Sequence, residues 1–196
     1  MRYKADLTAG SLKIAESRII ADLLLRGIAH QQWRDAIITQ NILQARHPAT
    51  AVRLARLLRG RLELMDAGLW KLVRDGTGML ASHALLAAAI KQSPLLGDFL
   101  DLVVREQYRL FHQTLSKQLW EDYLDECRNR DPEMPQWNDS TKRRLRSSVF
   151  QMLAQAGFLE STKTLKLQPV HIAPQVLRYL QERNEEYVLR CIQVCP

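Results

Sequence analysis

Hydrophobic residues recur every three to four positions through most of residues 12–130, and no stretch there alternates long enough to resemble a central strand. This spacing places the apolar side chains on one face of successive amphipathic helices. Gly27 predicts the end of a first helix, and Pro48 suits the first turn of a helix that runs to about Leu64. The pattern therefore predicts a helical bundle.

Two later helices in this part of the chain have recognisable starts. Asp66 and Ser93 are residue types that cap helix N-termini, and Pro94 suits the first turn after Ser93. The helix that Ser93 opens is expected to be long and to reach Phe111.

A change in composition marks residues 128–139, which read RNRDPEMPQWND. Two prolines, several turn formers and almost no aliphatic residue are typical of a linker or a long loop. We therefore predict a helical N-terminal domain over residues 1–130 and a smaller domain over residues 131–196.

The smaller domain has the order helix, hairpin, helix. A helix is expected from about Ser140 to Ala156, followed by a polar turn at 160–163 and an alternating segment at 164–168. Pro174 predicts the start of another helix, and a short last one should end near Val194. The predicted fold is mainly α, with a helix-turn-helix-like N-terminal part and a small winged-helix-like unit carrying a short β-hairpin.

Composition and charge then suggest a class of partner. With 196 residues, of which 46% are hydrophobic and 25% charged, the chain resembles ordinary globular proteins. Its net charge of +7 favours a polyanionic partner, although an acidic protein or a membrane surface would fit the charge as well.

The charge is segregated along the chain. Residues 46–74 hold seven basic and two acidic residues, and residues 142–166 hold six basic and one acidic, so each segment carries +5. Between them, residues 98–133 carry −4. Such segregation predicts two basic surfaces separated by an acidic one.

The first basic segment resembles the second helix of a helix-turn-helix. Apolar residues there repeat at helical spacing and predict a buried stripe of Ala51, Leu54, Ala55, Leu58 and Leu62. Arg53, Arg56 and Arg59 then face outward. A preceding helix is expected over residues 31–44, joined to it by a short turn at 45–47.

The second basic segment predicts a similar arrangement. An inward stripe is expected at Leu145, Val149, Met152, Leu153 and Ala156, with Arg143, Arg144, Ser147 and Gln151 facing outward. Lys163 and Lys166 would lie on the hairpin, where a wing touches the neighbouring backbone.

Both arginine faces also fit a simpler interpretation, because any solvated helix face can look this way. Two basic segments around an acidic one weigh against that interpretation. The tryptophans are scattered and suit packing better than base stacking, so duplex is favoured over single-stranded nucleic acid.

Motifs for chemistry are lacking. The five histidines and three cysteines show no ligand spacing, so neither a metal nor another cofactor is expected, and the acidic face of residues 121–126 is interpreted as solvated or as a protein-docking surface. There is no phosphate-binding glycine loop and no nucleophile elbow, so we do not expect an enzyme. Neither a signal peptide nor an apolar segment of membrane-spanning length is found, which predicts a cytoplasmic protein.

Several short segments resemble the BrxA family of BREX (bacteriophage exclusion) phage-defence systems. They are Ala5-Asp6-Leu7-Thr8-Ala9-Gly10, Glu16-Ser17-Arg18, Asn41-Ile42-Leu43-Gln44 and Pro48-Ala49-Thr50-Ala51 with Arg53. The resemblance covers the whole chain and is most specific over roughly the first 60 residues. Ala15 stands where the family pattern has proline, which affects helix entry and no binding residue.

The resemblance implies a non-enzymatic accessory protein encoded beside a methyltransferase, an ATPase and other BREX proteins. It also implies a helical fold likened to transcription antitermination factors and an affinity for double-stranded DNA. A label of inner-membrane protein sometimes attached to the family disagrees with this sequence.

We therefore expect a protein that binds double-stranded DNA through phosphate contacts, with little sequence specificity. The expected contacts are Arg53, Arg56, Arg59, Arg143, Arg144, Ser147, Gln151, Lys163 and Lys166. Two alternatives remain open: an adaptor that docks other BREX proteins, and an RNA-binding protein similar to antitermination factors.

Overall fold

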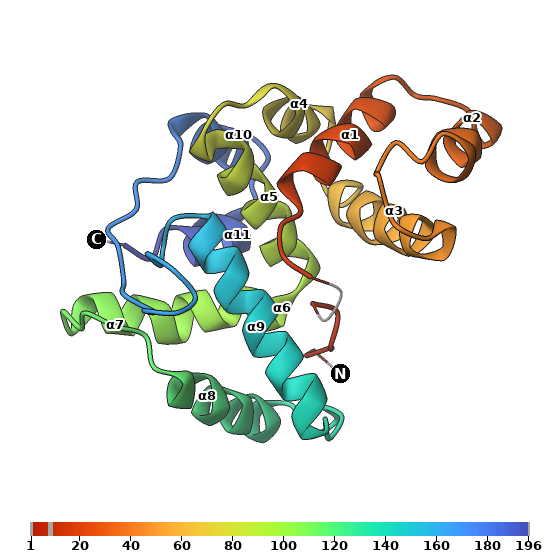
Figure 1. Ribbon diagram of the computed structural model, residues 1–196. Coiled ribbons are helices and arrows are strands. Elements are labelled where there is room, and N and C mark those ends of the chain that lie inside the picture. Colours follow the sequence, from red (N-terminus) through yellow and green to blue (C-terminus); the bar gives the residue numbers. More distant parts are fainter. Residues whose placement is uncertain (1, 8–9, 196) are drawn as a thin grey trace.

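A computed structural model describes residues 2–7 and 10–195 of the chain, and it is mainly helical (Figure 1). Thr8 and Ala9, which belong to the first segment of the family resemblance, lie outside the described residues. The helical elements are α1 (Ile14–Leu25), α2 (His30–Arg34), η1 (Asp35–Thr39), α3 (Pro48–Leu62), α4 (Ala67–Asp75), α5 (Met79–Gln92), α6 (Pro94–Asp98), η2 (Phe99–Val104), α7 (Arg105–Arg109), α8 (Lys117–Arg130), α9 (Asp139–Gln155), α10 (Pro174–Glu182) and α11 (Glu186–Ile192). The prediction of a mainly α fold is confirmed.

Most of the predicted helix ends are also confirmed. Gly27 takes a left-handed conformation after α1, with φ of 59°, and its N–H donates to the Leu24 carbonyl. Pro48 opens α3, and Asp66 caps α4 by accepting a hydrogen bond of 2.8 Å from the Gly68 N–H. These ends depend on local backbone chemistry, which the sequence displays directly.

The helix after Ser93 departs from expectation at both ends. Ser93 precedes it, but its hydroxyl donates to the Asp6 carboxylate (2.7 Å) and does not cap the helix. The helical run contains the π segment η2 and stops at Arg109. Phe111 then adopts a left-handed φ of 56°, and hydrogen bonds from Phe111 and His112 to Tyr108 and Gln107 close the end.

The predicted helix-turn-helix has a longer connection than expected. The first helix ends with η1 at Thr39, and residues 40–47 form an irregular link to α3. Asn41 shapes this link, because it tolerates a left-handed φ of 45° and its amide both donates to and accepts from the Ala45 backbone. The predictions of a helix to residue 44 and of a turn at 45–47 were therefore wrong.

The β-hairpin of the predicted winged-helix unit is not found. Among the described residues there are no strands, and the segment forms only isolated antiparallel bridges, between Leu159 and Leu167 and between Thr114 and Lys166. The physical reason lies at Leu165, whose φ of 52° interrupts the alternation. Its carbonyl accepts a hydrogen bond from the Leu115 N–H. The segment therefore bonds to residues 113–115 as well as to residues 158–160.

One helix, α5, lies at the centre of the fold (Figure 1). Its residues 81–90 are all buried, and α1, α3, α4, α6, α10 and α11 pack around it. Trp120 is buried as well, against the ring of Phe99 at a centroid distance of 5.0 Å, while the other tryptophans are partly buried. This confirms the packing role expected for the tryptophans. The division of the chain near residue 130 stays a prediction.

A buried carboxylate joins the two ends of the chain to the centre. Asp98, in α6, accepts hydrogen bonds from the Arg2 guanidinium (2.7 Å), the Tyr3 hydroxyl (2.8 Å) and the Tyr187 hydroxyl of α11 (2.9 Å). Tyr187 can approach because Gly97 has no side chain, and a Cβ there would collide with the Tyr187 hydroxyl. Asp98 thus fastens the N-terminal segment and α11 to one helix.

A buried histidine forms a second tertiary link. The Nδ1 of His83 in α5 accepts from the Ala173 N–H (3.0 Å), so its Nε2–H donates to the Ala156 carbonyl (3.2 Å). Burial lowers the pKa of His83 below its usual value, which favours this neutral form. The ring therefore holds the segments after α9 and before α10 against α5.

Replacing Asp98 with alanine should lower the free energy of unfolding by about 2–4 kcal/mol, because the buried Tyr3 hydroxyl and the half-buried Tyr187 hydroxyl lose their acceptor. The exposed Arg2 guanidinium remains hydrated and adds little to this loss. Chemical denaturation measures this loss. Asp122→Ala, on the exposed face of α8, serves as the control and should change stability by less than about 0.5 kcal/mol. Equal stability of the two variants would contradict the proposed importance of the Asp98 network.

The His83 pKa predicts that stability falls with acidification. The unfolded chain binds a proton at His83 near pH 6.5, whereas the folded chain resists it, so stability is lost as pH falls below about 6.5. His83→Ala should be less stable at pH 7 by about 2–4 kcal/mol and should lose part of this pH dependence. Denaturation at pH 7 and pH 5 tests this, with the exposed His47→Ala as control; a variant that keeps the wild-type pH dependence would disprove it.

Candidate nucleic-acid interface

The helix α9 separates its apolar and polar residues as predicted. All five residues of the expected inward stripe are buried, and Arg143, Arg144, Ser147 and Gln151 are exposed. Asn138 caps the helix by accepting from the Thr141 N–H (2.9 Å). The helix thus offers a polar, basic face along its length.

Near the start of α9, this face surrounds an open depression of about 370 Å3. It is lined by Ser140, Arg143, Arg144, Ser147 and Ser148, with no carboxylate among these residues. Within the described part of the chain, neither Arg143 nor Arg144 forms an ion pair. Both guanidinium groups are therefore available to an external anion.

Arg146 has a different role from its neighbours. It forms an ion pair of 2.7 Å with Glu121, and both side chains are largely shielded from solvent. This contact joins α9 to α8, and Glu121 neutralises the positive charge of Arg146. Only part of the basic segment therefore contributes to the surface.

Lys163 and Lys166 are exposed and lie beyond the other end of α9. The Ser161 hydroxyl accepts from the N–H groups of Lys163 and Thr164 and so orders the turn. From Arg144 to the end of α9 at Gln155 the helix rises by roughly 16 Å. Along the chain, the lysines follow the C-terminal end of α9, whereas the arginines lie near its start.

The helix α3 buries the predicted stripe, with Leu54 half-buried at its edge. Arg53 and Arg56 are exposed, as expected. Arg59 is only partly so, because its guanidinium lies 4.6 Å from the centre of the Trp33 ring and forms an ion pair of 2.7 Å with Glu63. The three predicted arginines therefore differ in their availability.

One arginine counted in the first basic segment points inward. Arg61 is fully buried, donates to the Gln92 amide oxygen (3.0 Å), and has a pKa lowered to about 10 by burial. Its place in α3 follows from helix geometry, since it neighbours the stripe residues Leu58 and Leu62. The first basic surface therefore carries less positive charge than the sequence predicted.

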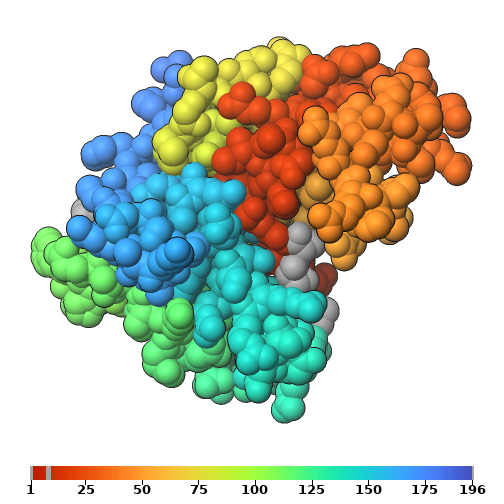
Figure 2. All heavy atoms as spheres, in the orientation of Figure 1, coloured from red at the N-terminus to blue at the C-terminus, as the bar shows by residue number. Residues whose placement is uncertain are grey.

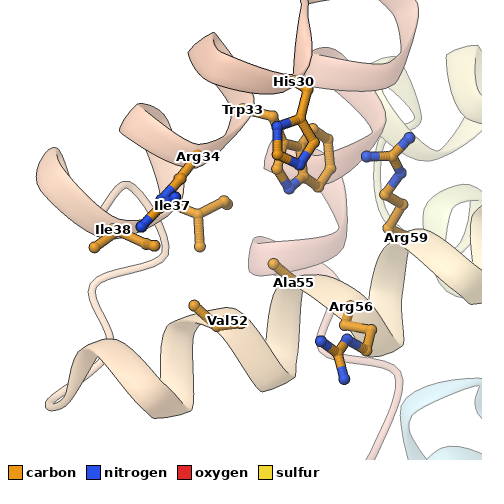
Figure 3. A pocket seen from close by; sticks show the side chains of 9 residues that line it. All are labelled: His30, Trp33, Arg34, Ile37, Ile38, Val52, Ala55, Arg56 and Arg59. Carbon is orange, nitrogen blue, oxygen red and sulfur yellow. The ribbon is translucent and has the colours of Figure 1, made fainter.

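Between α2–η1 and α3 lies a groove that the sequence did not reveal (Figure 3). His30, Trp33, Arg34, Ile37 and Ile38 line it from one side, and Val52, Ala55, Arg56 and Arg59 from the other. The spacing of Trp33 and Ile37 predicts an apolar helix face. Only the packing of α2–η1 against α3 shows that this face stays partly exposed to solvent.

Both basic helices reach one side of the molecule. Figure 2 shows residues 48–62 in orange and residues 139–155 in teal on the same face, on either side of the N-terminal part of the chain. The acidic helix α8 lies at the lower edge in the same view, next to α9 (Figure 1). Its Asp125 and Glu126 pair with Arg128 and Arg130 of the same helix.

Other chemistry would need metal ligands or reactive thiols. The described part of the chain contains no group of three or more His, Cys, Asp or Glu residues that could hold a metal ion. Burial raises the pKa of Cys127 and of Cys191 to about 11, so both thiols stay protonated at neutral pH. None of the helices among residues 2–7 and 10–195 has the length and apolar character needed to cross a membrane.

Comparison with known proteins identifies close relatives. The family model BrxA matches residues 1–184. A BREX protein BrxA from Paramagnetospirillum magneticum strain AMB-1 is 54% identical over 98% of this chain and 97% of its own, and one from Escherichia coli O9:H4 strain HS is 31% identical over 96% and 88%. A crystal structure of a protein from Magnetospirillum magneticum superposes with a TM-score of 0.91 at 52% identity, covering 99% of this chain and all of that one.

Proposed function

This chain belongs to the BrxA family of BREX phage-defence proteins, and we propose that within such a system it is a non-enzymatic accessory protein that binds double-stranded DNA. The proposed contacts are Arg53, Arg56, Arg59, Arg143, Arg144, Ser147, Gln151, Lys163 and Lys166. They act mainly on phosphates, so sequence specificity is expected to be low.

The observation that carries this proposal is the unpaired arginine surface at the start of α9. Arg143 and Arg144 border an open depression without carboxylates, and Ser140 and Ser147 line the same depression. Guanidinium groups bind phosphate oxygens through two parallel hydrogen bonds, and serine hydroxyls add further donors. Such groups on an exposed helix face suit a phosphate backbone.

The other proposed contacts extend this surface. Arg53 and Arg56 are exposed on α3, a helix that reaches the same face of the molecule as α9 (Figure 2). Lys163 and Lys166 add two exposed cations beyond the end of α9. Arg59 packs on Trp33 and is paired with Glu63, so we expect it to contribute less to DNA binding than the unpaired arginines.

The absence of enzymatic activity is part of the proposal. Neither the matched family nor the relatives carry the name of an enzyme. The buried thiols of Cys127 and Cys191 are poor nucleophiles while protonated, which supports the same view.

An adaptor role is the second candidate, and one observation favours it. The groove between α2 and α3 exposes apolar side chains that a duplex does not need, and α8 exposes carboxylates that DNA would repel. RNA stays an alternative to DNA, since phosphate contacts do not distinguish the two polymers.

The variant Arg143→Ala/Arg144→Ala should weaken binding to unrelated DNA duplexes equally. Removing two phosphate contacts should also reduce the slope of log affinity against log salt by about 1.8. Fluorescence anisotropy titrations across a salt series measure both effects, with duplex RNA as competitor.

The matched control is Arg109→Ala/Arg178→Ala, which removes the same charge from exposed positions on α7 and α10. It should leave the slope nearly unchanged. An equal loss in both double variants, or stronger competition by RNA than by DNA, would refute the proposed interface. Absence of any binding at low salt would favour the adaptor.

A further inference from the structure

The groove between α2–η1 and α3 has a volume of about 330 Å3 and opens to solvent (Figure 3). A cavity of this size accommodates a few side chains of a peptide. Its two walls come from helices joined by the irregular residues 40–47, so the groove is a product of how those helices pack.

The floor of the groove is apolar. Ile37 and Ala55 are buried beneath it, while Ile38 from η1 and Val52 from α3 remain 37% and 36% exposed on opposite walls. Covering these side chains would remove apolar surface from water, which is the main source of free energy in protein association. A hydrophilic sugar–phosphate backbone would gain nothing from this floor.

The rim of the groove is basic. Every ionisable residue that lines it is cationic or can become so: His30, Arg34, Arg56 and Arg59. Arg59 is neutralised by Glu63, but Arg34 and Arg56 form no ion pair within the described part of the chain. An occupant therefore needs apolar side chains for the floor and carboxylates for the rim.

We infer that this groove docks a short amphipathic segment of a partner protein, with an apolar face and with Asp or Glu residues along its edges. Helices that lie in grooves commonly present such a face, with anchors three or four residues apart. Carboxylates facing Arg34 and Arg56 would fix the register of the segment. This inference stands independently of whether the α9 surface binds DNA.

Two labelled amphipathic peptides of about 15 residues provide the probe. They share leucines at the same apolar positions and differ only in having glutamate or lysine at all polar positions. In fluorescence anisotropy with the full chain, the glutamate peptide should bind saturably and at least about tenfold more tightly than the lysine peptide. Equal binding of both, or binding of neither, would overturn the inference.

Variants then locate the binding. Val52→Glu should weaken binding of the glutamate peptide by about tenfold or more, because it places a negative charge on an apolar wall of the groove. Leu102→Glu is the matched control, since Leu102 is an exposed leucine of η2 outside the groove. It adds the same charge and should change affinity less than about twofold. Similar effects of both variants would show that the peptide binds elsewhere.

Two other occupants are distinguished by the same variants. If Val52→Glu weakened duplex DNA binding by more than Leu102→Glu and left peptide binding intact, the groove would belong to the nucleic-acid surface. If the wild type self-associated in sedimentation and Val52→Glu did not, the occupant would be a second copy of the chain. Either result would overturn the proposed partner segment.

Discussion

The fold depends on the carboxylate of Asp98 being satisfied in the interior. A buried carboxylate is strongly unfavourable unless charged or hydroxyl donors surround it. Arg2 and Tyr3 come from one end of the chain and Tyr187 from near the other, so burial of one charge requires both ends in place. Burial raises the pKa of Tyr3 and of Tyr187, which keeps both phenols as donors.

Around this anchor, the arrangement of helices divides the basic residues into different roles. Arg61 lies in the core and bonds to Gln92, Arg146 joins α9 to α8, and Arg59 packs on Trp33. Arg143 and Arg144 remain without partners in the described structure and form the surface proposed for phosphates. A net charge therefore indicates the kind of partner, while packing decides which charges meet it.

The proposed DNA surface and the proposed peptide groove suit a component of a multiprotein system. The first is a shallow polar depression lined by arginine and serine, and the second has an apolar floor with a basic rim. Their chemistry differs because phosphate binding needs charge without desolvation of apolar groups, whereas peptide docking gains most from such desolvation. The chain itself belongs to the BrxA family of BREX phage-defence proteins.

The sequence by itself determined the helical class, the ends of helices at Gly27, Pro48 and Asp66, and the two faces of α9, because caps and helical periodicity act within a few residues. Only the tertiary structure decided that the segment at Leu165 bonds to residues 113–115 as well as to residues 158–160 and forms no regular hairpin, and that Arg61 turns inward. The groove beside Val52 likewise exists only once two helices pack. These features depend on contacts between residues far apart in the chain, and local pattern carries no information about which distant residues meet.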